Sequence, residues 1–290
     1  MRRSLLSAVL SLSVLLSTLI AAHAASYTVT MIDVPNSRGT QARGINASGT
    51  IVGNYVSAES LGHAFLLIDG QFITFDFLEP NGFGGSPYGI NNQGTIAGIN
   101  GAEGFIFSLT QVTSINVPGS RVTYVGGINN RGEVAGYYQD AQGVDHDFLW
   151  SKDQFTTIDP PGSPLPLASL NDKGQVVGTY SDPTTGRPRG FLYDKGVFTT
   201  IDAPNSLRTE LFGINDAGQI VGAYQDTSAP QASHGFVLSK GVFTVLPGPG
   251  VNSPPGAAEA INQYGQIVGY FTDPTTGITH GFLATPTENP

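Results

Sequence analysis

Three observations predict the fold class: six copies of one short β repeat, a composition rich in turn-forming residues, and an N-terminal strand that lacks its neighbours. Together they predict an all-β protein. The expected form is a six-bladed β-propeller with four antiparallel strands per blade, closed by an N-terminal strand that completes the last blade. The composition agrees, because charged residues make up only 12% of the 290 residues, while Gly and Pro together number 57. The chain has no Cys, so an exported form would depend on its hydrophobic core and not on disulfides.

The N-terminus has the pattern of a signal peptide. A basic start at Arg2 and Arg3 precedes an uncharged apolar run, and Ala22 and Ala24 then form a small-residue cleavage site. This pattern favours cleavage after Ala24 over a retained membrane anchor. We therefore assign 1–24 to a signal peptide, 25–285 to a single propeller domain and 286–290 to a C-terminal tail. The expected location is secreted or periplasmic in a bacterium, with no stable membrane insertion after cleavage.

The charge balance excludes some partners. The formal net charge is −9, and loss of Arg2 and Arg3 with the signal peptide makes it −11. An acidic surface repels phosphate groups, which argues against nucleic acid and anionic membranes as partners. We expect a monomer that carries no cofactor.

The repeat is clearest in the segment GINDAGQIVG at 213–222, where a turn joins two short apolar runs. Its Asn recurs six times, at Asn46, Asn91, Asn129, Asn171, Asn215 and Asn262. A Gly follows each of these three residues later, at Gly49, Gly94, Gly132, Gly174, Gly218 and Gly265. A second Gly follows after four more residues, at Gly53, Gly98, Gly136, Gly178, Gly222 and Gly269.

Each copy contains four strand candidates, A to D. Strand A runs into the Gly-Ile-Asn segment, and the Asn-x-x-Gly that follows is a turn, because Asn favours its first position and Gly tolerates a left-handed backbone. Strand B carries the second Gly, where a neighbouring backbone is expected to approach closely. Strand C contains a His-Gly-Phe segment, and a short turn leads into strand D. No 3.6-residue apolar period is visible, so we expect almost no helix.

The two ends of the mature chain are complementary. Residues 29–37 resemble the strand D segment at 198–206, yet no strands A to C precede them, while the last copy ends after its strand C at 280–284. Pairing of the first strand with the last copy would close a ring and remove exposed sheet edges. A β-solenoid is the alternative, but it has no use for this arrangement.

The repeated Gly-Ile-Asn-x-x-Gly segments and the His63-Ala64-Phe65 triplet resemble the extracellular repeats of the HAF family, which is named for that triplet. The resemblance covers all six copies and implies bacterial export and a repeat architecture. It implies no activity and no catalytic residue. Two copies depart at the triplet, with Glu103 and Arg189 in place of the His.

The repeats diverge where strand A enters the blade, next to the predicted axis. Variable loops on a rigid scaffold carry recognition, so we place function on the face of the B–C and D–A loops and at its central opening. The mixture of charged and aromatic side chains there suits a sugar or polar polymer, and simple filling of the channel is the alternative. The candidate ligand-binding residues are Arg43, Tyr88, Tyr124, Arg208, Glu210 and Glu259.

Repeated acidic and histidine residues allow two interpretations each. Aspartates that end strand B, such as Asp182 and Asp273, either bind calcium or start a turn, and one Asp per loop favours the turn. The histidines of strand C, such as His63 and His280, either bind a metal or bond to a neighbouring loop, and their separation around a ring favours the bond. We assign no catalytic and no metal-binding residue.

These observations favour an exported, non-enzymatic binding or scaffold protein that recognises a glycan or an envelope protein. The alternative is an extracellular hydrolase or lyase that acts on a polysaccharide or small ester at the axial face. That alternative would require a pair of acids, such as Glu210 and Glu259, about 5–9.5 Å apart across the channel.

Overall fold

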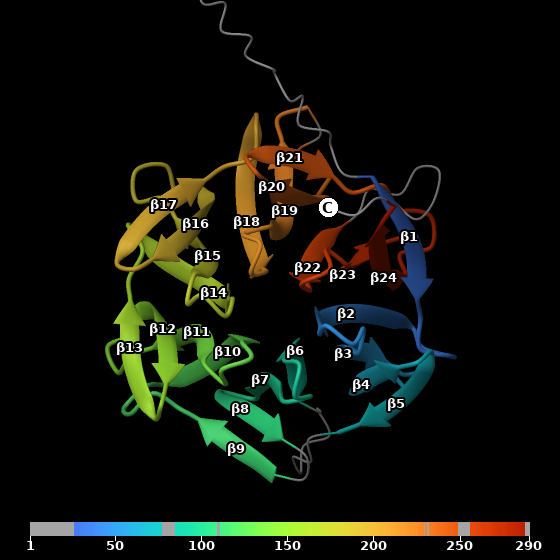
Figure 1. The fold of residues 1–290 in the computed structure, drawn as a ribbon, viewed down its shortest axis with the longest axis horizontal. Coiled ribbons are helices and arrows are strands. Elements are labelled where there is room, and N and C mark those ends of the chain that lie inside the picture. The colour runs from blue at the N-terminus through green and yellow to red at the C-terminus, as the bar shows by residue number, and fades with distance from the viewer. Residues whose placement is uncertain are drawn as a thin grey trace, which may run out of the picture.

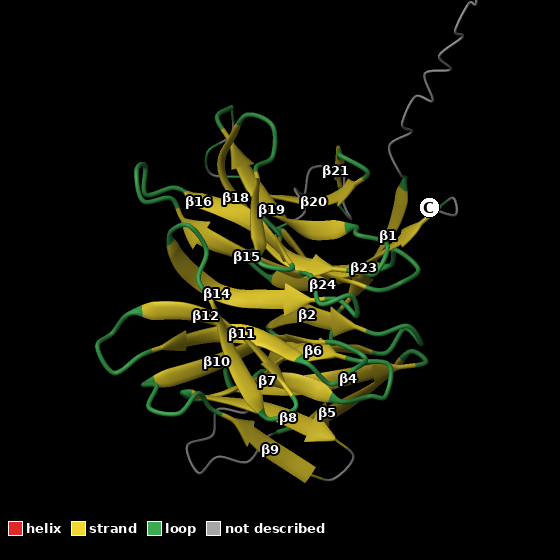
Figure 2. Cartoon of the chain, turned by 60° about the vertical axis from the view of Figure 1, so that its left-hand side comes forward, coloured by secondary structure: helices red, strands yellow, loops and turns green. Residues whose placement is uncertain are grey.

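The computed structural model describes residues 26–76, 85–108, 111–228, 230, 232–248 and 256–287. Within these segments every regular element is a β-strand and none is a helix, so the all-β expectation is confirmed for this part of the chain (Figure 2). The same segments contain no helix long and apolar enough to cross a membrane. The predicted signal peptide and its cleavage site lie outside the described residues.

The described strands form units of four that are arranged around a central axis, which makes the fold a β-propeller (Figure 1). Four units are separate antiparallel sheets. The other eight strands form one sheet that divides into two units, because a single residue pair, Gly39 with Thr279, joins the two halves. We number the units from first to sixth in the order of their inner strands.

Within each unit the strands run from an inner strand A to an outer strand D. The A strands are β2 (Gly39–Ile45), β6 (Ser86–Ile90), β10 (Val122–Ile128), β14 (Ser163–Leu170), β18 (Ser206–Ile214) and β22 (Ala257–Ile261). The B strands are β3 (Ile51–Val56), β7 (Ile96–Asn100), β11 (Val134–Gln139), β15 (Val176–Ser181), β19 (Ile220–Asp226) and β23 (Ile267–Thr272). The C strands are β4 (Gly62–Ile68), β8 (Glu103–Ser108), β12 (Asp145–Ser151), β16 (Pro188–Asp194), β20 (His234–Ser239) and β24 (Thr279–Pro286). The D strands are β5 (Gln71–Phe75), β9 (Gln111–Ile115), β13 (Gln154–Ile158), β17 (Val197–Ile201), β21 (Val242–Val245) and β1 (Tyr27–Ile32).

The N-terminal strand completes the last unit, as predicted. β1 pairs antiparallel with β24 along its whole length, from Tyr27 opposite Pro286 to Ile32 opposite Gly281. The pairing continues beyond the strand, where the Thr287 amide donates to the Ser26 carbonyl at 2.9 Å. The expectation of a tail from residue 286 is therefore wrong at its start, because β1 offers backbone partners as far as Thr287.

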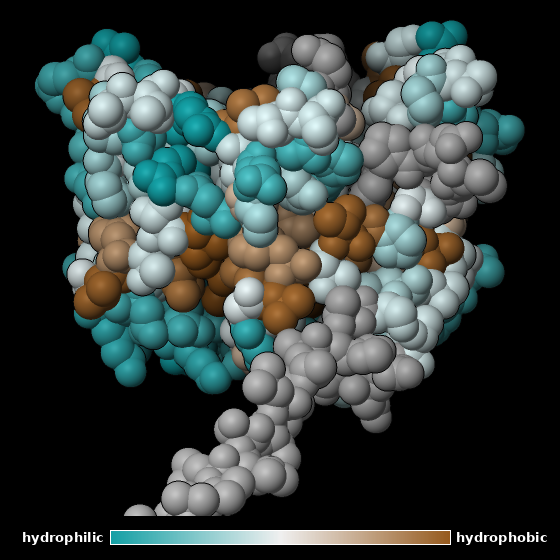
Figure 3. All heavy atoms as spheres, turned by 90° about the horizontal axis from the view of Figure 1, so that it is seen from above, coloured by the Kyte–Doolittle hydropathy of each residue, from teal (hydrophilic) through white to brown (hydrophobic). Residues whose placement is uncertain are grey.

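The hydrophobic core lies between neighbouring units. One cluster combines Val52 and Ala64 of the first unit with Ile90, Ile96 and Phe105 of the second. On the side of the ring that Figure 3 shows, apolar side chains lie in the middle, between two hydrophilic ends. Each unit is therefore stabilised by burying its faces against the units on either side.

The glycine of strand B allows strand A to lie close, as predicted. A Cβ on Gly53 would stand 2.0 Å from the Gln41 carbonyl oxygen, and one on Gly269 would stand 1.9 Å from that of Ala257. The ring of the strand C phenylalanine fills the other side, because Phe65 Cε1 would lie 2.8 Å from the Gly53 Cβ. The repeated glycine is thus required by packing inside the sheet.

A hydrogen bond between a histidine and an aspartate also joins the two ends of the chain. His280 Nδ1 lies 2.9 Å from Asp33 Oδ2, and His63 makes the same contact with Asp76 inside the first unit. We expect His280→Gln to lower the free energy of unfolding by less than about 1 kcal/mol, because the pair is partly exposed and the backbone ladder of β1 remains. Urea unfolding of this variant beside the control His63→Gln checks this. A much larger loss for His280→Gln alone would mean that ring closure depends on the contact between His280 and Asp33.

Candidate functional site

A β-bulge interrupts the pairing of strands A and B at the same place in each unit. Arg43, between Ala42 and Gly44, has no paired residue in strand B, and neither does Glu259, between Ala258 and Ala260. In the fourth unit the irregular segment is longer and extends from Leu165 to Ser169. A bulge redirects the side chain of its extra residue. We call the six bulge residues that reach the channel the bulge layer, and they are Arg43, Tyr88, Gly126, Leu167, Phe212 and Glu259.

A cavity of about 120 Å³ occupies the centre of the ring, room for several water molecules. Its lining contains the whole bulge layer, the last residue of each of the six A strands, and the repeated asparagines that follow them. Beyond the asparagines the lining ends in a rim, which we define as Ala47, Asn92, Asn130, Asp172, Asp216 and Gln263. The cavity therefore lies at the end of the channel that carries the A–B turns, whereas the sequence favoured the opposite loop face.

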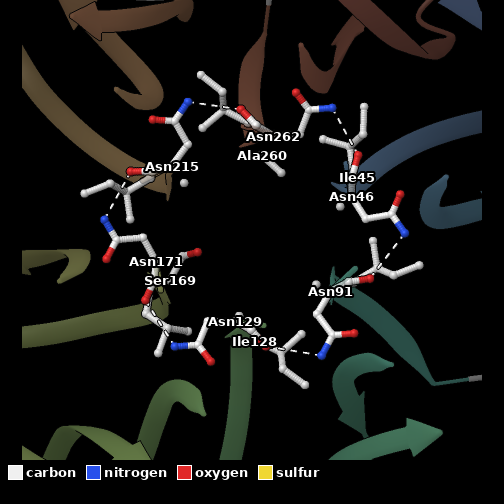
Figure 4. A pocket seen from close by; sticks show the side chains of 18 of the residues that line it. Ile45, Asn46, Asn91, Ile128, Asn129, Ser169, Asn171, Asn215, Ala260 and Asn262 are labelled. Atoms are coloured by element: carbon white, nitrogen blue, oxygen red, sulfur yellow. Dashed lines mark hydrogen bonds between the residues drawn. The ribbon is translucent and has the colours of Figure 1, made fainter. Parts of the chain in front are cut away.

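The six repeated asparagines form a closed ring of hydrogen bonds around this cavity (Figure 4). Each side-chain amide donates to the backbone carbonyl of the asparagine in the next unit, from Asn46 to Asn91 at 3.2 Å through to Asn262 back to Asn46 at 3.0 Å. Each side-chain oxygen also accepts the amides of its own turn, as Asn91 does from Gln93 and Thr95. The sequence predicted the turn, and the structure adds the contact between units.

One half of the bulge layer is polar and one half is apolar. Arg43 Nη1 lies 2.9 Å from Glu259 Oε2, and Arg43 Nη2 donates to Gln41 at 2.7 Å. The guanidinium also lies over the rings of Tyr88 and Tyr270, at 5.3 and 5.0 Å from their centroids. Leu167 and Phe212 line the cavity from the fourth and fifth units.

Burial controls the ionisation of this polar half. Burial opposes the charge of Arg43, but Glu259, Tyr88 and Tyr270 together outweigh it, and the pKa of Arg43 lies above its ordinary value. Burial also raises the pKa of Tyr88 and of Tyr270. At neutral pH the site therefore presents a charged arginine that is already paired with Glu259, and two uncharged phenols.

The structure brings together three of the six predicted ligand-binding residues, Arg43, Tyr88 and Glu259. The other three do not line the cavity. Arg208 forms an ion pair with Glu210 instead. Tyr124 stacks on Tyr137 with ring centroids 5.9 Å apart.

Three of the four strand C histidines, His63, His146 and His280, lie within hydrogen-bond distance of a neighbouring aspartate, as predicted. His146 Nδ1 lies 2.9 Å from Asp159 Oδ1, which follows the adjacent strand D. In the fourth unit Arg189 takes the place of the histidine and pairs with Asp202 and Asp182. No group of three or more His, Asp or Glu side chains suited to a metal ion occurs in the described segments.

The aspartates that end strand B start turns, which confirms that interpretation. Asp182 accepts the amides of Thr184 and Thr185, both at 2.9 Å. These bonds stabilise the carboxylate and lower the pKa of Asp182 to about 2. Asp273 accepts the Thr275 amide at 2.7 Å in the equivalent loop.

The sequence missed two groups of residues at this site. Tyr270 lies in strand B, where nothing in the repeat pattern distinguishes it from an ordinary core aromatic. The rim residues follow the repeated asparagine directly, and their variation from Ala to Asp was the available signal. The Asn92 side chain accepts the Ala47 amide, and Asp216 accepts that of Asp172, so parts of the rim also join neighbouring units.

No family model and no curated protein matches this sequence. Among solved structures, the chain is similar to a gluconolactonase, XC5397 from Xanthomonas campestris, with 12% identity, a TM-score of 0.55 and 90% of each chain covered. It is also similar to the Aleuria aurantia lectin in complex with Fucα1-6GlcNAc, with 13% identity, a TM-score of 0.52, and 91% of this chain and 97% of that chain covered. AofleA from Arthrobotrys oligospora has 13% identity and a TM-score of 0.52, with coverage of 91% and 85%. At this identity the likeness concerns the fold alone, which is consistent with either a binding or a hydrolytic protein.

Proposed function

We propose that the protein is an exported six-bladed β-propeller that binds a neutral saccharide in its axial cavity and does not cleave it. The observation that carries this proposal is the divided bulge layer. A sugar ring has hydroxyl groups at its edge and apolar C–H faces. Glu259 and Tyr88 offer polar partners on one side, and Phe212 and Leu167 offer an apolar surface on the other.

The charges of the cavity favour a neutral ligand over an acidic one. Among the residues that line it, Arg43 is the one basic side chain, and Glu259, Gln41 and two tyrosine rings already engage its guanidinium. Asp172 and Asp216 add negative charge at the rim. An incoming carboxylate or sulfate would find no free cation and would meet two like charges.

The hydrolase remains the second candidate, and the geometry of the acids argues against it. In glycoside hydrolysis two carboxyl groups must face the scissile bond together in one site. Glu259 lies beside Arg43, and Glu210 lies beside Arg208. Glu210 and Glu259, the acid pair that the sequence suggested, therefore each form an ion pair with an arginine.

Export is part of the proposal and is supported by sequence features. The basic start, apolar run and Ala22-x-Ala24 site have the pattern of a signal peptide, and the repeats resemble those of an exported family. The absence of Cys is compatible with an oxidising compartment. We place the protein in the periplasm or outside the cell, as a monomer with a glycan as its partner.

Calorimetric titration of the mature chain with cellotetraose, tetraacetylchitotetraose and tetragalacturonate tests the proposal. We expect at least one of the two neutral tetrasaccharides to bind at least about tenfold more tightly than the acidic one, a difference of about 1.4 kcal/mol. Phe212→Ala should weaken this binding about tenfold, because the apolar face of the sugar loses its partner.

Tyr124→Ala is the matched control, since it removes an aromatic ring that does not line the cavity, and its affinity should stay unchanged. Equal binding of the acidic tetrasaccharide, or no binding of either neutral one, would overturn the proposal. Release of new reducing ends during the titration would instead support the hydrolase.

A further inference from the structure

Asp147 is a buried carboxyl group without a hydrogen-bond partner. Its exposed fraction is 1%, and neither carboxylate oxygen has a partner among the described residues. It follows His146 in strand C of the third unit, where the repeat elsewhere has a residue with little or no side chain. The equivalent residues are Ala64, Gly104, Gly190, Gly235 and Gly281.

This position faces the next unit around the ring. A Cβ on Gly104 would lie 2.6 Å from Val125 Cγ2 of the third unit, and one on Gly190 would lie 2.6 Å from Leu211 Cγ of the fifth. By the same geometry Asp147 faces β14 of the fourth unit, with which β12 is in contact. The fully buried residue of β14 in this core is Ala168, which leaves more room than Val125 or Leu211 does.

We call the contact between Asp147 of the third unit and β14 of the fourth unit the seam. The segment of β14 at this seam is irregular and reaches the axial cavity. Leu167 has a φ of 87°, a left-handed conformation that a leucine rarely adopts. Its neighbour Ala168 belongs to the core of the seam, while Leu167 itself lines the cavity. A displacement of Ala168 at the seam therefore also displaces Leu167, because the two residues are adjacent in one bulge. Leu167 belongs to the apolar half of the bulge layer.

We propose that Asp147 makes the seam between the third and fourth units sensitive to pH: the seam is closed while the carboxyl is protonated and loosens when it ionises. The seam itself does not depend on the proposed function. The consequence for the ligand does rest on it, because loosening of β14 displaces Leu167 and weakens saccharide binding.

The charges around Asp147 support this direction. Burial, with the negative charge of Asp159 at the end of β13, raises the pKa of the Asp147 carboxyl well above its ordinary value. On β11, Tyr137 is a neutral phenol whose own pKa is raised by its burial and by its bond to Asp145. On β12, His146 Nδ1 also contacts Asp159, at 2.9 Å from Oδ1. β14 contributes no ionisable side chain, since its sequence is SPLPLASL.

The pH dependence runs opposite to that of most aspartates. The Asp147 carboxyl holds its proton more tightly when the seam is closed than when it is open. The contribution of this group to the stability of the closed seam is therefore fully present below the ordinary aspartate pKa of about 4. As pH rises further, the open form loses its proton first, and opening costs less free energy. The equilibrium constant for opening then grows up to about tenfold per pH unit until the folded-state pKa is passed.

Hydrogen exchange of the mature chain between pH 4 and pH 8 tests the proposal, with rates corrected for the intrinsic effect of pH. We expect the amides of β14 to exchange faster with rising pH in the native chain, by up to about tenfold per unit, and not in Asp147→Asn or Asp147→Ala. The alanine variant repeats what Ala64 does in the first unit, and the asparagine variant keeps the shape of the side chain.

Asp153→Asn is the control, because Asp153 is an exposed aspartate of the same unit, and its exchange should follow the native chain. Equal pH dependence of β14 in the native chain and both Asp147 variants would overturn the proposal. Binding of cellotetraose and of tetraacetylchitotetraose, measured over the same pH range, separates the two proposals. If β14 exchange depends on pH but neither tetrasaccharide binds at pH 4, the pH-sensitive seam stands and the saccharide site is rejected.

Discussion

A single methyl group on Gly53 is expected to prevent the first unit from folding. In Gly53→Ala the new Cβ would stand 2.0 Å from the Gln41 carbonyl oxygen and 2.8 Å from the ring of Phe65. Neither neighbour can move freely, because one is backbone inside the A–B pair and the other is fully buried. We expect a loss of more than about 4 kcal/mol in the free energy of unfolding, or no soluble protein. Urea unfolding, followed by the circular dichroism of the β-sheet, measures it.

Gly62→Ala is the matched control in the same unit. Gly62 lies at the start of β4, has no positive φ, and would place its Cβ more than 4 Å from any neighbour outside its adjacent residues. Its effect should stay within about 0.5 kcal/mol. Similar stabilities for the two variants would show that β2 and β3 can separate without cost, and that the repeated strand B glycine has another role.

The residues that repeat in this chain serve the backbone, and for that reason the fold could be predicted from them. Gly53 and its equivalents leave room for the backbone of strand A inside each sheet, and the asparagines begin six identical turns. The unmatched strand at the N-terminus indicated its pairing with β24, because only that strand lacked an outer neighbour. Local requirements of this kind depend on a few adjacent residues, which a sequence displays directly.

The candidate site was only partly predictable, because it depends on contacts between distant units. Divergence before each Gly-Ile-Asn marked Arg43, Tyr88 and Glu259, but not that a bulge turns them towards the axis. Arg43 and Glu259 belong to the first and last units, and ring closure makes them neighbours. Nothing local distinguishes them from Arg208 and Glu210, which pair two residues apart on one strand.

The asparagine ring escaped prediction for the same reason, because it too depends on contacts between units. An asparagine at the first position of a turn is sufficiently explained by its own loop, so its sequence context gives no sign of a second partner. The structure shows that one side chain does both tasks, with its oxygen inside the turn and its amide on the next unit. Because this happens six times, the innermost layer of the propeller is held by side chains and not by a sheet.

Replacing one asparagine should therefore weaken the whole ring. In Asn91→Ala the turn loses the acceptor for Gln93 and Thr95, at 3.1 and 2.9 Å, and the second unit loses its 3.2 Å bond to the Asn129 carbonyl. Three buried or half-buried hydrogen bonds, at about 1 kcal/mol each, predict a loss of about 3 kcal/mol in the free energy of unfolding. Urea unfolding measures this loss, and hydrogen exchange should show faster opening at the contact between the second and third units.

Two variants separate the turn from the ring. Asn91→Asp keeps both acceptor bonds within the turn but removes the donor to Asn129, so its effect isolates the contact between units. Asn92→Ala removes an exposed side chain that accepts only the Ala47 amide among the described bonds, and it should cost less than about 1 kcal/mol. If Asn91→Asp were as stable as the native chain, the ring would be a consequence of six similar turns. If it lost stability and opened between the second and third units, the repeated asparagine would be the element that joins neighbouring blades around the axis.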